Sequence, residues 1–189
     1  MEKHFWSFWV NNLCGIDEAG RGPLAGSLVI AGVVLEKEIE GLMDSKKLTP
    51  KKREVLYEQI VKHSNYHIVS FSASDVDELG ISQCLQNGLL SIQDHFGEIE
   101  YLFDGNCTFG VSNIETMVKA DTKIAQVSAS SILAKVTHDR EIIEFAKLYP
   151  EYGFEKHKGY GTKAHIEAIL KYGRCPIHRK TFKVKGMDK

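Results

Sequence analysis

The sequence predicts an α/β fold in which helices flank a mixed β-sheet, and three observations support this prediction. Short apolar segments of strand length alternate with longer segments of helical period. Their order is β-β-α-β-α-β-β-α, followed by a small helical C-terminal extension. The composition, with 43% hydrophobic and 26% charged residues over 189 positions, suits one globular domain with a sizeable core.

Two adjacent strands open the predicted sheet. The first is the apolar run from Leu13 to Asp17, which precedes the turn-forming residues 20–23. The second, Leu28 to Leu35, is almost entirely apolar and rich in β-branched residues, as buried strands are. A helix follows, because Thr49 has the form of an N-cap before Pro50 at the first helical position.

The middle of the chain continues the alternation. The first helix should end near His63. Tyr66 to Ser72 alternates apolar and polar residues, which predicts a third strand. Asp75 to Phe96 predicts a helix despite Gly80 and Gly88.

Two short strands and two helices complete the chain. Ile99 to Phe103 and Ile114 to Val118 have strand patterns. Thr122 to Leu148 is rich in Ala, Ser and Ile and predicts a long helix, with Thr137 as a candidate break point. Thr162 to Tyr172 predicts a last helix in a small C-terminal cap on the sheet.

The net charge of -1 hides an asymmetry along the chain. From Glu151 to Lys189 there are ten Lys or Arg against four Asp or Glu, so this segment carries +6 and the first 150 residues carry -7. The acidic part could hold a metal and the basic part could hold phosphate. A solvated surface of mixed charge explains the counts equally well.

The cysteines and the hydropathy pattern predict a cytoplasmic protein that does not enter a membrane. Cys14, Cys84, Cys107 and Cys175 show none of the spacings of thiolate zinc sites and are interpreted as reduced thiols. No stretch approaches the roughly 18 apolar residues of a membrane span. Phe5 to Trp9 lacks a small-residue cleavage site and predicts an aromatic arm rather than a secretory signal.

Carboxylates follow several of the predicted strands. Asp17 and Asp104 each end an apolar strand, and Asp121 begins a helix after a third, so these side chains could meet at one edge of the sheet. Glu18 could join them only if the strand stops or bulges, because adjacent strand residues point to opposite faces. On spacing alone, solvated turn residues are the more common explanation.

A cluster of this kind would require cations. Packed carboxylates repel one another unless positive charge neutralises them, and oxygen ligands alone favour Mg²⁺ or Mn²⁺. Two such ions about 4 Å apart could activate water for in-line attack on a phosphodiester. The acidic residues are therefore candidate metal ligands of a nuclease.

Six motifs, in this order and over nearly the whole chain, resemble the ribonuclease HII family. They are GIDEAGRGPLAG (15–26), DSKKL (44–48), FDG (103–105), ASSILAKVT (129–137), HKGYGT (157–162) and GRCPIHRKTF (173–182). Their combination is far more specific than any single motif.

The resemblance implies an RNase H-like catalytic domain over residues 1–150 and a basic helical extension over residues 151–189 packed on it. It implies an endoribonuclease that hydrolyses the RNA strand of RNA/DNA hybrids and cuts 5′ to single ribonucleotides in duplex DNA, leaving 3′-hydroxyl and 5′-phosphate ends, as in ribonucleotide excision repair. Asp17, Glu18, Asp104 and Asp121 match the catalytic and metal-binding positions. The implied cofactor is Mg²⁺ or Mn²⁺, with two ions during catalysis, and we expect a monomer.

Further matches concern substrate binding. Gly20, Arg21 and Gly22 match the loop that recognises the ribose 2′-hydroxyl, the group that distinguishes RNA from DNA, and a backbone can approach a sugar most closely at glycine. Tyr160 matches the tyrosine that packs against the next deoxyribose, and Lys46 a residue near the substrate phosphate. Without the resemblance, a buried turn tyrosine and a solvated lysine would explain these two residues.

Three positions depart from the family pattern. Ala120 stands where glycine is usual before the aspartate, so the backbone there must accept a Cβ; His138 replaces an arginine, and Thr181 a serine. None removes a carboxylate, although the Cβ of Ala120 leaves the geometry at Asp121 and its metal affinity open. Nearby, His178 and Arg179 are expected either to brace the tail or to touch the backbone of the duplex.

Three alternatives are weighed against this prediction. The related ribonuclease HIII group carries an additional N-terminal substrate-binding domain, which we do not expect here because about a dozen residues precede the first strand. A DNA-cutting nuclease of the same fold would not need the glycine loop at 20–22. A binding module with a structural cation would not need clustered carboxylates, because Lys and Arg suffice for phosphate.

Overall fold

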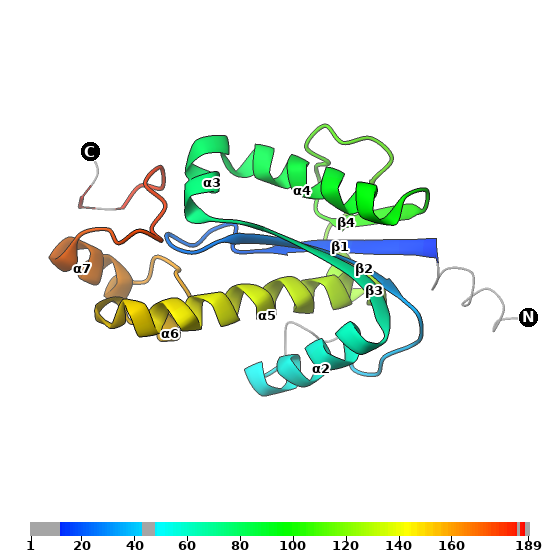
Figure 1. Ribbon diagram of the computed structural model, residues 1–189, viewed down its shortest axis with the longest axis horizontal. Coiled ribbons are helices and arrows are strands. Elements are labelled where there is room, and N and C mark those ends of the chain that lie inside the picture. The colour runs from blue at the N-terminus through cyan, green and yellow to red at the C-terminus, as the bar shows by residue number, and fades with distance from the viewer. Residues whose placement is uncertain (1–11, 43–47, 185, 188–189) are drawn as a thin grey trace, which may run out of the picture.

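A five-stranded mixed sheet lies at the centre of the computed structural model, which describes residues 12–42, 48–184 and 186–187 (Figure 1). The strand order is β3-β2-β1-β4-β5. The pairs β1–β2 and β2–β3 are antiparallel, whereas β1–β4 and β4–β5 are parallel. The strands are β1 (Leu13–Ala19), β2 (Leu28–Leu35), β3 (Ser64–Phe71), β4 (Glu100–Asp104) and β5 (Glu115–Met117).

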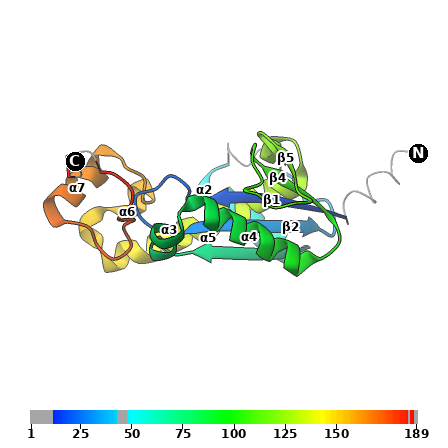
Figure 2. The ribbon, with the colours of Figure 1, turned by 90° about the horizontal axis from the view of Figure 1, so that it is seen from above.

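Helices cover both faces of the sheet, which confirms the predicted α/β class (Figures 1 and 2). The helices α3 and α4 lie on one face, and α2 and α5 on the other. None of the described helices is long and apolar enough to cross a membrane. The helices are α2 (Pro50–Lys62), α3 (Ala73–Leu79), α4 (Ile81–Phe96), α5 (Ala125–Leu148), α6 (Phe154–His157) and α7 (Lys163–Tyr172), with 3₁₀-helices η2 (Ala120–Thr122) and η3 (Pro150–Tyr152).

Local signals explain where several helices begin. The Thr49 hydroxyl accepts a hydrogen bond from the Lys52 amide before Pro50, as the N-cap prediction requires. Ser72 and Asp75 form a reciprocal capping box at the start of α3.

Two helix predictions are corrected. The predicted helix from Asp75 to Phe96 is two helices, because Gly80 adopts a φ of +77° that ends α3 before α4 begins. The long helix begins at Ala125 rather than Thr122 and runs without a break through Thr137.

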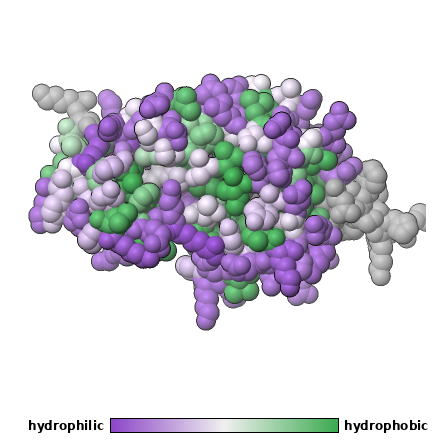
Figure 3. All heavy atoms as spheres, in the orientation of Figure 1, coloured by the Kyte–Doolittle hydropathy of each residue, from purple (hydrophilic) through white to green (hydrophobic). Residues whose placement is uncertain are grey.

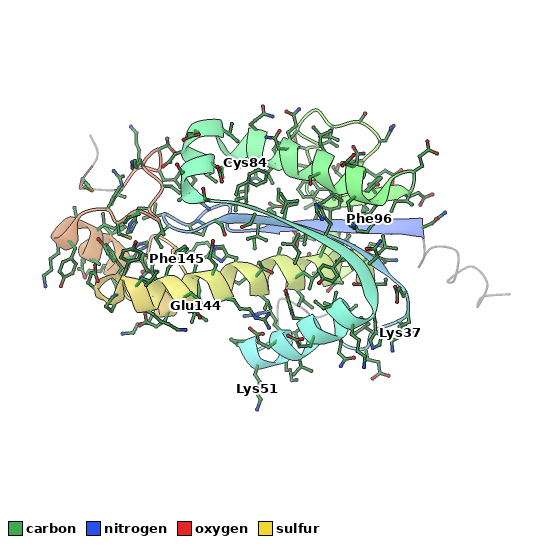
Figure 4. All side chains as sticks on the ribbon, in the orientation of Figure 1. Lys37, Lys51, Cys84, Phe96, Glu144 and Phe145 are labelled. Atoms are coloured by element: carbon green, nitrogen blue, oxygen red, sulfur yellow. The ribbon has the colours of Figure 1, made fainter. Side chains whose placement is uncertain are left out.

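The core has a layer on each face of the sheet. Ile16 and Ile30 pack with Leu85 and Leu89 of α4 on one side, and Cys84 also lies on α4 in this layer (Figure 4). On the other side, α5 packs directly on β1 at Gly15, where a Cβ would lie 2.3 Å from backbone atoms of Gln126 and Val127. Glycine is therefore needed for this close contact.

The C-terminal residues form a third apolar cluster at one end of the molecule. Phe154 of α6, Ile169 of α7 and Ile177 of the tail pack with Ile142 near the end of α5. The same cluster includes Ala25, from the loop between β1 and β2. The tail and this loop therefore share a core, and Figure 1 shows them side by side.

The outer surface is mainly hydrophilic in the view of Figure 3, with apolar atoms in the middle of this face. The aromatic arm at residues 5–9 and Lys46 lie outside the described residues.

Candidate active site

Asp17 and Asp104 are brought together by the parallel pairing of β1 and β4. Ile16 is paired with Phe103, so the next residue on each strand is an aspartate. Since side chains at equivalent positions of paired strands share a face, both carboxylates lie on the side that α5 covers. The Asp17 carboxylate also accepts a hydrogen bond from the amide of Glu18, at 2.8 Å.

Asp121 completes the cluster from the short 3₁₀-helix η2, one turn before α5. Carboxylate oxygens of Asp17, Asp104 and Asp121 all lie within 4.8 Å of one another. Asp121 is fully buried and Asp17 is 8% exposed. The structure thus joins the three aspartates that the sequence analysis placed at one edge.

The departure at Ala120 is accommodated in this turn. Lys119, and not Ala120, has the left-handed conformation, with φ of +59°. The Ala120 side chain is buried with Leu102 and Val127. Its amide donates to the Asp104 carboxylate at 3.2 Å, so the residue that carries the extra Cβ also orients a ligand of the cluster.

The electrostatics of the cluster favour a cation. Burial raises the pKa of Asp17 well above its usual range, and the charges of Glu18 and Asp104 raise it further, against a hydrogen bond from Ser131 that lowers it. Two unit charges about 5 Å apart repel by about 3 kcal/mol at an effective dielectric constant near 20. Three carboxylate ligands that can converge on one ion, and a repulsion that this ion would relieve, fit a divalent metal.

The Glu18 side chain lies on the opposite face of the sheet from that of Asp17. The expected stop or bulge at Asp17 is absent: β1 continues to Ala19 in regular register with β2. Glu18 is therefore not part of the three-aspartate cluster. Burial raises its pKa, with Asp104 adding to this effect and Arg21 opposing it, so its charge still interacts with the cluster.

The Gly20–Gly22 loop adjoins Glu18. The Arg21 guanidinium lies 3.6 Å from the Glu18 carboxylate and over the Phe109 ring, 5.7 Å from its centroid. Gly20 has a φ of +86°, and a Cβ there would lie 2.3 Å from the Ser27 carbonyl oxygen. Among the residues that the structure describes, a Cβ on Gly22 would meet only the Tyr160 ring, at 3.9 Å. Gly20 is thus required by the fold, whereas Gly22 has room for a methyl group.

Tyr160 lies beside this loop and is 43% exposed. The Lys135 ammonium lies over its ring, 5.9 Å from the centroid, and is also paired with Asp139 at 2.7 Å. The tyrosine is therefore a surface residue near the loop rather than a core residue.

His138, one of the three departures noted in the sequence, fills the space beneath the loop. Its ring is fully buried, and a Cβ on Gly20 would lie 2.7 Å from it. Its Nδ1 lies 3.3 Å from the carboxylate of Asp139. Two residues near the site were not predicted from the sequence: Ser131, which is hydrogen-bonded to Asp17, and Lys135, which lies over the Tyr160 ring. The signal was their i, i+4 spacing on one face of α5.

Comparisons with known proteins agree with this geometry. Residues 14–185 match the sequence profile described as Ribonuclease HII. A Ribonuclease HII of Sulfurovum sp. (strain NBC37-1) is 70% identical over 93% of this chain and 94% of that protein. One from Aliarcobacter butzleri (strain RM4018) is 57% identical over 94% of both.

Solved structures give the same result for the fold. RNase HII of Archaeoglobus fulgidus, in a complex with PCNA, has a TM-score of 0.78 and 30% identity, and the match covers 92% of this chain and 96% of that one. Ribonuclease H2 of Pyrococcus horikoshii OT3 has a TM-score of 0.77 and 30% identity over 92% of this chain and 94% of that one.

Proposed function

The chain belongs to the ribonuclease HII family and is a metal-dependent hydrolase that acts on RNA/DNA hybrids; we propose that it also cuts 5′ to single ribonucleotides in duplex DNA, leaving 3′-hydroxyl and 5′-phosphate ends. Family membership also rules out the alternative of a binding module without turnover. We further propose that the protein acts as a monomer in the cytoplasm, in ribonucleotide excision repair.

One observation carries the proposal: the glycine loop lies between the acidic residues and Tyr160. Arg21 is 3.6 Å from Glu18, and Gly22 faces the Tyr160 ring. A duplex whose ribose lies on the loop would therefore have its next sugar near the tyrosine and a phosphate near the carboxylates. This arrangement is what recognition of a ribose followed by a deoxyribose requires.

The acidic residues have a defined part in this chemistry. Asp17, Asp104 and Asp121 would hold divalent cations, with Glu18 as a further ligand from the other side of β1. When bound, Mg²⁺ or Mn²⁺ activates a water and stabilises the leaving oxygen in an in-line displacement. The proposal assigns two ions to the active complex.

The remaining residues bind and orient the substrate. The backbone of Gly20, Arg21 and Gly22 would contact the 2′-hydroxyl, and the Arg21 guanidinium could hold a phosphate. The exposed Tyr160 ring would pack on the following deoxyribose. Lys46, outside the described residues, would contribute to phosphate binding.

The test uses three labelled duplexes: DNA with one ribonucleotide, a long RNA/DNA hybrid, and all DNA, each with and without Mg²⁺ or Mn²⁺. We expect metal-dependent cutting 5′ to the ribonucleotide and an intact all-DNA control. Cutting of the hybrid alone would refute the single-ribonucleotide activity.

A matched variant tests the role of the loop. Gly22→Ala has space in the structure, so its melting temperature should equal that of the wild type, while the added methyl should obstruct the ribose and lower kcat/KM by at least about tenfold. Unchanged cleavage by Gly22→Ala would contradict ribose recognition by this loop.

A further inference from the structure

Arg179, in the C-terminal tail, is a buried cation whose guanidinium is bonded to backbone carbonyls. The residue is only 1% exposed. Its Nη2 donates to the carbonyl oxygens of Gly20 at 2.6 Å, Gly26 at 2.9 Å and Ser27 at 3.0 Å. Its Nη1 donates to that of Arg21 at 3.2 Å, and its Nε to that of Gly26 at 3.1 Å. A contact between this guanidinium and the duplex backbone is thereby excluded.

No other side chain could make this set of bonds. Arginine presents five N–H donors in one plane, whereas lysine presents three from a single atom. An apolar side chain of similar volume would leave buried carbonyls unpaired, which is destabilising. Burial lowers the pKa of Arg179 to about 10, which still leaves it charged at neutral pH.

The bonds to Gly20 and Arg21 determine the direction of the next two amides. A peptide unit is planar and trans, so its N–H points opposite to its carbonyl. Because the carbonyls of Gly20 and Arg21 point toward Arg179, the N–H groups of Arg21 and Gly22 point away from it. The same rule holds at Gly26, whose carbonyl faces Arg179 while the next amide, of Ser27, donates to Glu141 at 3.2 Å.

The tail is held firmly enough for Arg179 to act as a fixed support. Its own amide donates to the Leu24 carbonyl at 2.8 Å, and the Gly26 amide donates to the Ile177 carbonyl at 2.9 Å. Beyond it, the amide and hydroxyl of Thr181 both donate to Asp77. Thr181, which stands where serine is usual, therefore supplies a hydroxyl donor as serine would.

We propose that Arg179 is a positioning residue for substrate recognition: by binding the carbonyls of Gly20 and Arg21, it directs the N–H groups of Arg21 and Gly22 toward the ribose of the substrate. The C-terminal extension is then an integral part of the recognition site. This inference rests on the proposed ribose-recognising function of the loop.

The experiment is a double-mutant cycle on cleavage of duplex DNA with one ribonucleotide, at saturating Mn²⁺ or Mg²⁺. The variants are Arg179→Lys, Gly22→Ala and their combination. If Arg179 acts through the loop, Arg179→Lys lowers kcat/KM by at least about tenfold. The kcat/KM of the double variant is then within about threefold of that of the less active single variant.

The matched control is Ile169→Ala, alone and combined with Gly22→Ala. It removes buried apolar surface from the same extension but none of the loop's hydrogen bonds. Ile169→Ala alone should lower kcat/KM only slightly. In the combination, the factors by which the two substitutions lower kcat/KM should multiply. This control separates a general loss of stability from a loss of loop geometry.

The outcomes are distinct. Wild-type cleavage by Arg179→Lys, or losses that multiply with those of Gly22→Ala, would overturn the proposal for Arg179 while leaving ribose recognition standing. If Gly22→Ala itself has no effect, the proposed function of the loop fails, and the inference about Arg179 fails with it. Where Arg179→Lys does not fold, Arg179→Gln, which removes the buried charge and keeps planar N–H donors, takes its place in the cycle.

Discussion

The Nε2 atoms of His165 and His178 lie 3.0 Å apart inside the C-terminal extension. His165 Nδ1 lies 2.9 Å from the carbonyl oxygen of Tyr160 and must donate to it, so its Nε2 accepts when the ring is neutral. His178 then donates from Nε2, and its Nδ1 accepts from the amide of Cys175 at 2.9 Å. One proton on each ring satisfies every hydrogen bond in this series, and a second proton on either ring would break one of these bonds.

This pair predicts acid sensitivity. Burial lowers the pKa of both His165 and His178 to about 4, from an ordinary value near 6.5. A lowered histidine pKa gives stability that is complete above pH 6.5 and is lost as the pH falls toward 4, by up to about 1.4 kcal/mol per pH unit for each residue. Melting temperatures between pH 8 and pH 5 should fall accordingly.

His165→Gln should reduce this pH dependence, because it removes one of the two buried rings that must stay neutral. Identical pH slopes for wild type and His165→Gln would refute the assignment.

The aspartate cluster predicts opposite effects of one substitution on stability and activity. The raised pKa of Asp17 means that the metal-free protein loses stability as the pH rises through that pKa. Asp17→Asn should therefore melt higher than the wild type in EDTA at neutral pH, yet have almost no cleavage activity. Asp104→Asn should also keep its fold and lose cleavage.

Thermal denaturation with increasing Mn²⁺ checks the same cluster. The wild type should melt at higher temperature as metal is added, since an ion that binds only the folded state stabilises it. Asp17→Asn and Asp104→Asn should show a much smaller rise. Full activity of either variant with Mg²⁺ or Mn²⁺ would contradict the catalytic assignment.

Gly15→Ala predicts a severe loss of stability. The added Cβ would lie 2.3 Å from backbone atoms of Gln126 and Val127, so α5 would have to move off β1. We expect a decrease of several kcal/mol in the free energy of unfolding, measured by urea denaturation. Gly22→Ala, whose Cβ has no neighbour closer than 3.9 Å in the described part of the chain, is the control with wild-type stability. Wild-type stability of Gly15→Ala would mean that the contact can relax.

Tyr160 predicts a substrate-dependent loss. Tyr160→Ala removes an exposed ring near Gly22, so kcat/KM should fall by about tenfold or more on single-ribonucleotide DNA and much less on long hybrids. Tyr160→Phe keeps the ring and should remain close to the wild type on both. An equal loss by Tyr160→Ala on both substrates would instead indicate a structural role.

Local patterns were sufficient for much of the fold. The apolar run of β2 and the N-cap at Thr49 depend only on neighbouring residues, and the structure confirms both. The helix break at Gly80 also has a local cause, the positive φ of this residue. It was not predicted, because a glycine within an apolar helical pattern does not show which φ it adopts.

For the site, the sequence by itself determined that Asp17 lies on the first strand and that Asp104 ends the fourth, and, through the family motifs, the type of enzyme. Only the tertiary structure decided that β1 continues past Asp17, which separates Glu18 from the three aspartates, and that Arg179 binds a loop more than 150 residues earlier in the chain. The physical reason is that periodicity and capping depend on residues within a few positions, whereas these contacts depend on strand pairing and packing between distant segments.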